Sequence, residues 1–130
     1  MTKAIRSAAT IRATPTQVFE ALMDERRHAK FTGAKASISR KVGGAFACYG
    51  PHLSGFNVDL VPGKRIVQAW RSSGWPAGVF SIATFALSRA RGGRTRIRFT
   101  QVGVPASSRM HISDGWRTYY WKPLKAYLEK

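Results

Sequence analysis

The central part of the chain alternates between apolar and polar residues, which is the pattern of strands that bury one face. In residues 94–101, Thr95, Ile97 and Phe99 share one face with Gln101, while arginines occupy the other. Glycine and proline separate the alternating segments, and six consecutive strands with short turns favour an antiparallel meander. The predicted strands lie at 3–12, 35–40, 44–50, 53–61, 64–72, 79–90 and 94–103.

Two short helices are predicted directly after the first strand. Thr14 is suited to cap the first helix, Pro15 fits its first position, and Gln17 stands where a capping box requires it. Apolar residues at helical spacing follow from Val18 onward. The second helix is expected at 25–31, and it should end near Gly33 because glycine adopts the left-handed conformation readily.

The last segment predicts an amphipathic helix of roughly eighteen residues. Its apolar stripe consists of Ile112, Trp116, Tyr120, Leu124, Tyr127 and Leu128, flanked by Tyr119 and Trp121. Pro123 cannot donate a hydrogen bond to the Tyr119 carbonyl, so we expect a kink there that lets the helix follow a curved sheet. The kink would leave that carbonyl as a spare acceptor, and the alternative is a helix that simply restarts at Pro123.

The strand at 53–61 has apolar residues on one face and Asn57 and Asp59 on the other. We expect the apolar residues to face inward, which would leave Asp59 outside and paired with an arginine. In the opposite register, a buried Asp59 would be the best acid/base candidate of the chain.

Composition and charge narrow the class of protein. The 130 residues are 44% hydrophobic and 12% aromatic, which predicts a single globular domain spanning 1–130. Twenty-two lysines and arginines against six acidic residues give a net charge of +16, which attracts phosphate-rich or acidic partners. One cysteine, Cys48, precludes an internal disulfide. With no signal-peptide pattern or long apolar run, we expect a cytoplasmic protein without membrane insertion.

Residues with catalytic or metal-binding chemistry are scattered. His28, His52 and His111 lie in different segments, and Cys48 with His52 lacks a third ligand, so we expect no metal site. There is no Gly-x-Ser-x-Gly turn, phosphate loop or dinucleotide motif. The sequence therefore predicts no catalytic residue and no cofactor.

Six segments in this order resemble the START-like superfamily, also called SRPBCC, helix-grip or Bet v-like. They are ATPTQVFEALMD at 13–24, GGAF at 43–46, GFNVDLVPGKRIVQAWR at 55–71, GWPAGVFSIATFAL at 74–87, GGRTRIRFTQVGVP at 92–105 and ISDGWRTYYWKPLKAYLE at 112–129. The resemblance is to the branch named after the C-terminal domain of the activator of heat-shock protein 90 ATPase. It implies an α+β helix-grip fold, in which six to seven curved antiparallel strands wrap around the C-terminal helix.

In that fold, members that bind ligands hold an apolar molecule between sheet and helix. The resemblance implies a roof of Trp116, Tyr120 and Tyr119, with Trp75 at the mouth. The walls would be formed by Phe46, Trp70, Phe85 and Phe99. The alternative for each ring is that it simply fills the core.

The second signal is a row of Arg94, Arg96 and Arg98 on the outer face of its strand. Three functions follow from these features. The first is binding of a small, largely apolar ligand. The second is a chaperone regulator or adaptor that binds an acidic protein, or weakly a polyanion, through the basic surface. The third is a polyketide-cyclase-like enzyme, although we expect binding without catalysis.

Overall fold

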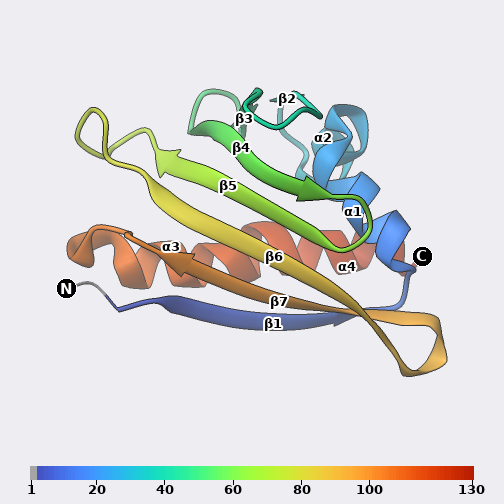
Figure 1. Cartoon of the computed structure of the whole chain (residues 1–130). Coiled ribbons are helices and arrows are strands. Elements are labelled where there is room, and N and C mark those ends of the chain that lie inside the picture. Colours follow the sequence, from blue (N-terminus) through green and yellow to red (C-terminus); the bar gives the residue numbers. More distant parts are fainter. Residues whose placement is uncertain (1–2) are drawn as a thin grey trace.

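The computed structural model describes residues 3–130, which form one antiparallel sheet, two helices near the N-terminus and a long C-terminal helical segment (Figure 1). The strands are β1 (Ile5–Ile11), β2 (Ala36–Ile38), β3 (Ala45–Cys48), β4 (Leu53–Val61), β5 (Arg65–Ser72), β6 (Ser81–Ala90) and β7 (Arg94–Val102). The helices are α1 (Pro15–Met23), α2 (Glu25–Thr32), α3 (Arg109–Trp116), the π-helical turn η3 (Arg117–Trp121) and α4 (Lys122–Leu128). The short 3₁₀ turns are η1 (Arg91–Gly93) and η2 (Ala106–Ser108).

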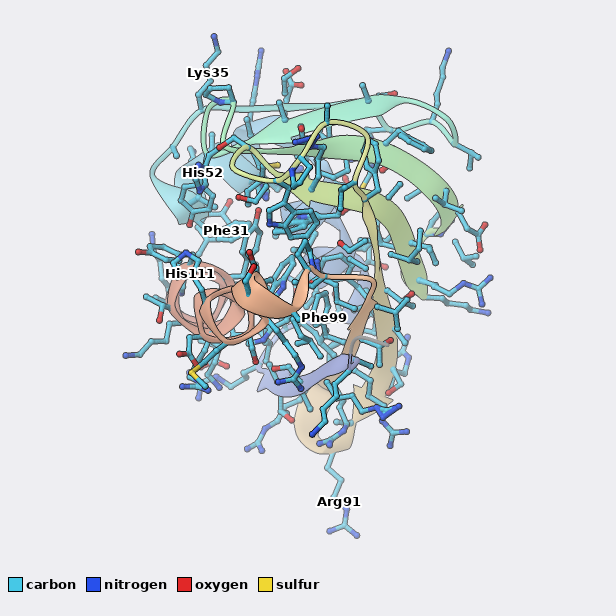
Figure 2. The ribbon with its side chains drawn as sticks, turned by 90° about the vertical axis from the view of Figure 1, so that its left-hand side faces the viewer. Phe31, Lys35, His52, Arg91, Phe99 and His111 are labelled. Atoms are coloured by element: carbon cyan, nitrogen blue, oxygen red, sulfur yellow. The ribbon has the colours of Figure 1, made fainter. Side chains whose placement is uncertain are left out.

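The seven strands are arranged in the order β1-β7-β6-β5-β4-β3-β2, which confirms the meander and the helix-grip fold. β1 closes one edge of the sheet by pairing with β7, with Ile5 opposite Gln101 and Ile11 opposite Thr95. The sheet curves around the helical segment α3–η3–α4, as Figure 2 shows in a view along that segment. Across residues 3–130, no helix combines the length and apolar character that a membrane span requires.

The predicted helix signals operate as expected at the N-terminal helices. Thr14 Oγ1 accepts from the Gln17 backbone N–H at 3.1 Å, and Gln17 Oε1 accepts from the Thr14 N–H at 2.8 Å. Asp24 caps α2, whose end at Gly33 adopts the left-handed conformation with φ of 72°. These local signals therefore fix where α1 and α2 begin and where α2 ends.

The alternation in β7 is confirmed: its even-numbered arginines are exposed and its odd-numbered residues are buried. The inward residues of β6 are Ser81, Ala83, Phe85 and Leu87, and they are buried in the same core. The core therefore lies between the concave face of the sheet and the helices.

The prediction for β4 was wrong at its centre. Asn57 is buried, with 1% of its surface exposed, whereas Phe56 and Val58 are about two-fifths exposed at 42% and 43%. The cause is a β-bulge between Asn57 and Asp59, which shifts the pairing with β5 by one residue. Beyond the bulge Asp59 faces outward and pairs with Arg65 at 2.6 Å, so this part of the prediction is confirmed.

The C-terminal helical segment buries the predicted stripe of Ile112, Trp116, Tyr120 and Leu124. Instead of a simple restart at Pro123, the backbone widens into the π-helical turn η3, which directly precedes α4. There the N–H of Lys122 bonds to the carbonyl of Arg117, five residues back. The extra residue in this turn lets Trp121 become buried, while Tyr119 stays 55% exposed.

Candidate ligand-binding pocket

A pocket of about 440 Å³ lies between the helical segment and the strand ends on one side of the molecule. It is lined by Tyr49, His52, Leu53, Trp70, Ser72, His111, Ile112, Gly115, Trp116, Tyr119 and Tyr120. Three segments form it: the turn between β3 and β4, the end of β5, and helices α3 and η3. In Figure 2, His52 above and His111 below lie on the same side of the molecule, at the rim. Its volume is within the usual range for small-molecule sites.

The inner wall of the pocket is fixed by a chain of buried hydrogen bonds. Trp116 Nε1 donates to Gln101 Oε1 at 2.8 Å, and Gln101 Nε2 donates to Ser81 Oγ at 2.9 Å. Ser81 Oγ in turn donates to the Trp70 carbonyl at 2.8 Å. This series of hydrogen bonds links α3 to β7, β6 and β5. It therefore holds the indole of Trp116 in one orientation.

Behind Trp116 the interior is filled with aromatic rings. Phe99 is 1% exposed, and its ring centroid is 4.3 Å from that of Trp116 and 5.5 Å from that of Trp121. Phe85 packs against Phe99 at 5.0 Å. For Phe99 the structure shows the core-filling alternative, and the hollow occupies only one end of the space between sheet and helix.

The other predicted site residues divide into three groups. Trp70, Trp116, Tyr119 and Tyr120 line the pocket. Phe46 and Phe85 instead border a much smaller cavity of about 20 Å³ behind Tyr120. Trp75 is buried against Trp70, at 5.6 Å between ring centroids, and it does not line the mouth as predicted.

Tyr49 is a pocket residue that the sequence analysis did not identify. Its hydroxyl donates to the Tyr119 carbonyl at 2.6 Å, which is the acceptor that Pro123 leaves free. Its ring is also in edge-to-face contact with Tyr119 and Tyr120, at 5.8 and 5.9 Å. The sequence shows a tyrosine beside the turn glycine Gly50, but it does not indicate that the partner of this tyrosine is the distant Tyr119.

Burial changes the acid–base properties of the groups around the pocket. It raises the pKa of the Cys48 thiol to about 12 and the pKa of Tyr49 to about 12. Burial also raises the pKa of Tyr120. No Asp or Glu is among the pocket-lining residues, and residues 3–130 contain no cluster of three potential metal ligands. The pocket is therefore mostly apolar, with a few polar side chains.

The outer face of the sheet carries two neighbouring kinds of side chain. Arg94, Arg96 and Arg98 are exposed along β7, as predicted. Further along the same face, Phe56, Ala69, Ile82 and Val102 are cross-strand neighbours on β4, β5, β6 and β7. Phe56, Ile82 and Val102 are exposed, so this face combines an apolar row with positive charge.

Comparison with known proteins places the chain in a family. Residues 12–129 match the family described as "Activator of Hsp90 ATPase homolog 1-like protein". The chain belongs to this family. It is 30% identical over 116 residues to the human activator of 90 kDa heat shock protein ATPase homolog 1, covering 89% of this chain and 34% of that protein. A homologue from Dictyostelium discoideum is 28% identical over 116 residues, covering 89% of this chain and 30% of its own length. The chain therefore spans about a third of the length of these relatives.

Solved structures support the same fold. An HSP90 activator from Plasmodium falciparum superposes with a TM-score of 0.90 at 19% identity, covering 97% of this chain and 96% of that one. The Aha1 dimer from Colwellia psychrerythraea gives a TM-score of 0.83 at 20% identity, with coverages of 98% and 96%. At these identities the likeness establishes the architecture alone, including the curved seven-stranded sheet and the long C-terminal helix.

Proposed function

We propose that the chain binds a small, largely apolar molecule in the 440 Å³ pocket between the strand ends and the C-terminal helical segment. The observation that carries the proposal is a pocket with mostly apolar walls that opens at one side of a tightly packed interior. Trp70, Trp116 and Tyr120 are buried and form its inner wall.

The lining supports an apolar ligand with limited polarity. Aromatic and aliphatic side chains dominate the walls, and the polar atoms belong to tyrosines, histidines and Ser72. Apolar walls with a few oriented polar groups are the usual composition of small-molecule sites. The cytoplasmic location stays part of the proposal, since Cys48 is a free and buried thiol.

The proposal is tested with the uncharged dye N-phenyl-1-naphthylamine, whose fluorescence rises in apolar surroundings. Because the protein is strongly basic, an uncharged dye avoids non-specific attraction to its surface. We expect saturable binding at one site per chain, and native mass spectrometry of the gently purified protein should show a bound small molecule. A fluorescence increase that does not saturate, together with a mass equal to that of the bare chain, would contradict the proposal.

A second candidate function is binding to an acidic protein partner, and the outer sheet face favours it. The relatives are named as activators of a heat-shock ATPase, and the face that holds Arg94, Arg96 and Arg98 also exposes Phe56 and Ile82. Exposed apolar residues beside a charged row are typical of protein interaction surfaces. We infer that an Hsp90-type ATPase is a candidate partner for this face.

This second function is tested by measuring whether the chain stimulates such an ATPase. Changing Arg94, Arg96 and Arg98 to Glu should abolish the stimulation. The matched control changes Arg26, Lys30 and Lys122 to Glu, which alters the net charge equally on the exposed helical side. Equal losses in both triple variants would show that net charge, and not this surface, is responsible.

A further inference from the structure

A second cavity of about 20 Å³ lies directly behind the wall of the ligand pocket. Trp70, Trp116 and Tyr120 line both spaces, so these side chains lie between them. The smaller cavity is large enough for one water molecule or one hydroxyl group. Its lining includes the polar side chains of His28, Cys48 and Gln68.

These polar groups differ in whether they have a hydrogen-bond partner. Gln68 Nε2 donates to Asn57 Oδ1 at 3.3 Å. His28 is 2% exposed, and its Nδ1 has no hydrogen-bond partner. Within residues 3–130 it is the one buried side-chain nitrogen or oxygen atom that lacks a partner. A buried polar atom without a partner is costly, and native proteins generally supply one.

The aromatic surroundings hold His28 in place. Its ring is in contact with Phe31 and Tyr120, at 4.9 and 5.4 Å between ring centroids. Burial lowers its pKa to about 4, so the imidazole is neutral at pH 7. A neutral imidazole has one donor nitrogen and one acceptor nitrogen, which matches a hydroxyl group, because a hydroxyl both donates and accepts.

We propose that the small cavity is the inner end of the ligand site, where His28 hydrogen-bonds the hydroxyl group of a ligand whose apolar body fills the larger pocket. This inference rests on the proposed ligand-binding function. It specifies the ligand class as a compact aromatic or alicyclic alcohol or phenol. Rotation of the Tyr120 side chain joins the two spaces, and without ligand a water molecule occupies the place of the hydroxyl. The ligand group then replaces a hydrogen bond that the water made.

The test compares 2-naphthol with naphthalene, which differ by one hydroxyl group, by calorimetric titration of the wild-type protein. We expect 2-naphthol to bind about five- to tenfold more tightly, the usual worth of one hydrogen bond. In His28→Phe the ratio of the two dissociation constants should fall to about one. If the ratio falls instead in His111→Phe, the hydroxyl binds at the rim and the proposal is wrong.

The outcomes separate this inference from the function on which it rests. If neither compound binds to the wild type, the pocket itself is not a ligand site. If both bind equally well, or if the advantage of 2-naphthol survives in His28→Phe, the pocket stands and the inner hydroxyl site is refuted.

A second measurement needs no substitution and applies even if His28→Phe does not fold. The imidazole ¹⁵N resonances of His28 in the wild type should shift when 2-naphthol is added and stay in place with naphthalene. Resonances that respond equally to the two compounds would overturn the inference.

Discussion

His28 is a neutral base in the interior of a protein that carries a net charge of +16. It faces Phe31 and Tyr120, and no acidic group is among its ring contacts or along the cavity that it borders. Its proton is therefore opposed by burial alone, which lowers the pKa from 6.5 to about 4. A depressed pKa of this kind links protonation directly to unfolding.

We predict a loss of stability as the pH falls from about 6.5 to about 4. In this interval the unfolded chain binds a proton at His28 and the folded chain does not, so the free energy of unfolding decreases by up to about 3 kcal/mol. Urea unfolding at several pH values measures the effect. The same series on His28→Phe should be much flatter, and an equally steep decline in that variant would assign the loss to other groups.

Asn57 shows what the sequence could and could not predict at single positions. The alternation in β7 was sufficient to separate Arg96 from Ile97, because that strand pairs regularly on both sides. In β4 the same reasoning failed, because a bulge at Val58 shifts the register, and no local residue marks it. The buried face then receives an amide instead of Phe56.

The side-chain amide of Asn57 supplies hydrogen-bond partners to the backbone of the loop after β2. Its Nδ2 donates to the Ser39 and Lys41 carbonyls at 2.8 and 3.0 Å, and its Oδ1 accepts from Gln68. We predict that Asn57→Ala lowers the free energy of unfolding by about 2–3 kcal/mol, because two part-buried carbonyls and the buried amide of Gln68 lose a partner. Chemical denaturation measures this loss.

The matched control for Asn57 is Asp59→Ala, two residues further along the same strand. Its ion pair with Arg65 is exposed, so the expected loss is about 0.5 kcal/mol. Equal losses for the two variants would mean that Asn57 does not organise the loop.

At the scale of elements, the π-helical turn η3 and the turn between β3 and β4 depend on each other. Pro123 leaves the Tyr119 carbonyl without a backbone donor from that position, and the Tyr49 hydroxyl supplies one. Tyr49 adopts the left-handed conformation with φ of 54°, which is unfavourable for a side chain of its size. The hydrogen bond and the ring contacts with Tyr119 and Tyr120 offset this strain.

A double-mutant cycle tests the dependence. We predict that Tyr49→Phe costs about 1 kcal/mol of stability in the wild-type background. In a Pro123→Ala background the cost should be smaller by about 0.5 kcal/mol, because the new N–H at 123 competes for the same carbonyl. Strictly additive effects in thermal or chemical unfolding would show that the two elements are not coupled.

The local effects of Pro123, Gly33 and the capping residues could be predicted from the sequence, because each acts on its own neighbours. The pocket could be predicted only in part, because it depends on residues that are far apart in the sequence. Whether an aromatic ring lines a hollow or fills the core depends on contacts between distant elements, as with Phe99 against Trp116 and Trp121. Tyr49 was missed because its partner lies 70 residues away.

At the scale of the whole molecule, the interior has a filled half and an open half. The aromatic cluster around Phe85 and Phe99 stabilises the end of the grip that holds Trp121. The other end, toward α3 and the β3–β4 turn, keeps its pocket because Gly115 stands where a larger residue would project into it. A Cβ at Gly115 would meet one atom within 4 Å, Cδ2 of Tyr119 at 3.7 Å, so the site has room for a side chain.

The most direct measurement titrates N-phenyl-1-naphthylamine into the wild type, Gly115→Ala and Gly115→Leu, with the free energy of unfolding determined for each. Both substitutions should raise helix stability by about 0.5–1 kcal/mol, since glycine is a poor helix former. We predict that Gly115→Ala keeps most of the dye binding and that Gly115→Leu, whose side chain fills the pocket, loses it while remaining folded. Undiminished binding by a stable Gly115→Leu protein would contradict the account, because the dye would then bind elsewhere.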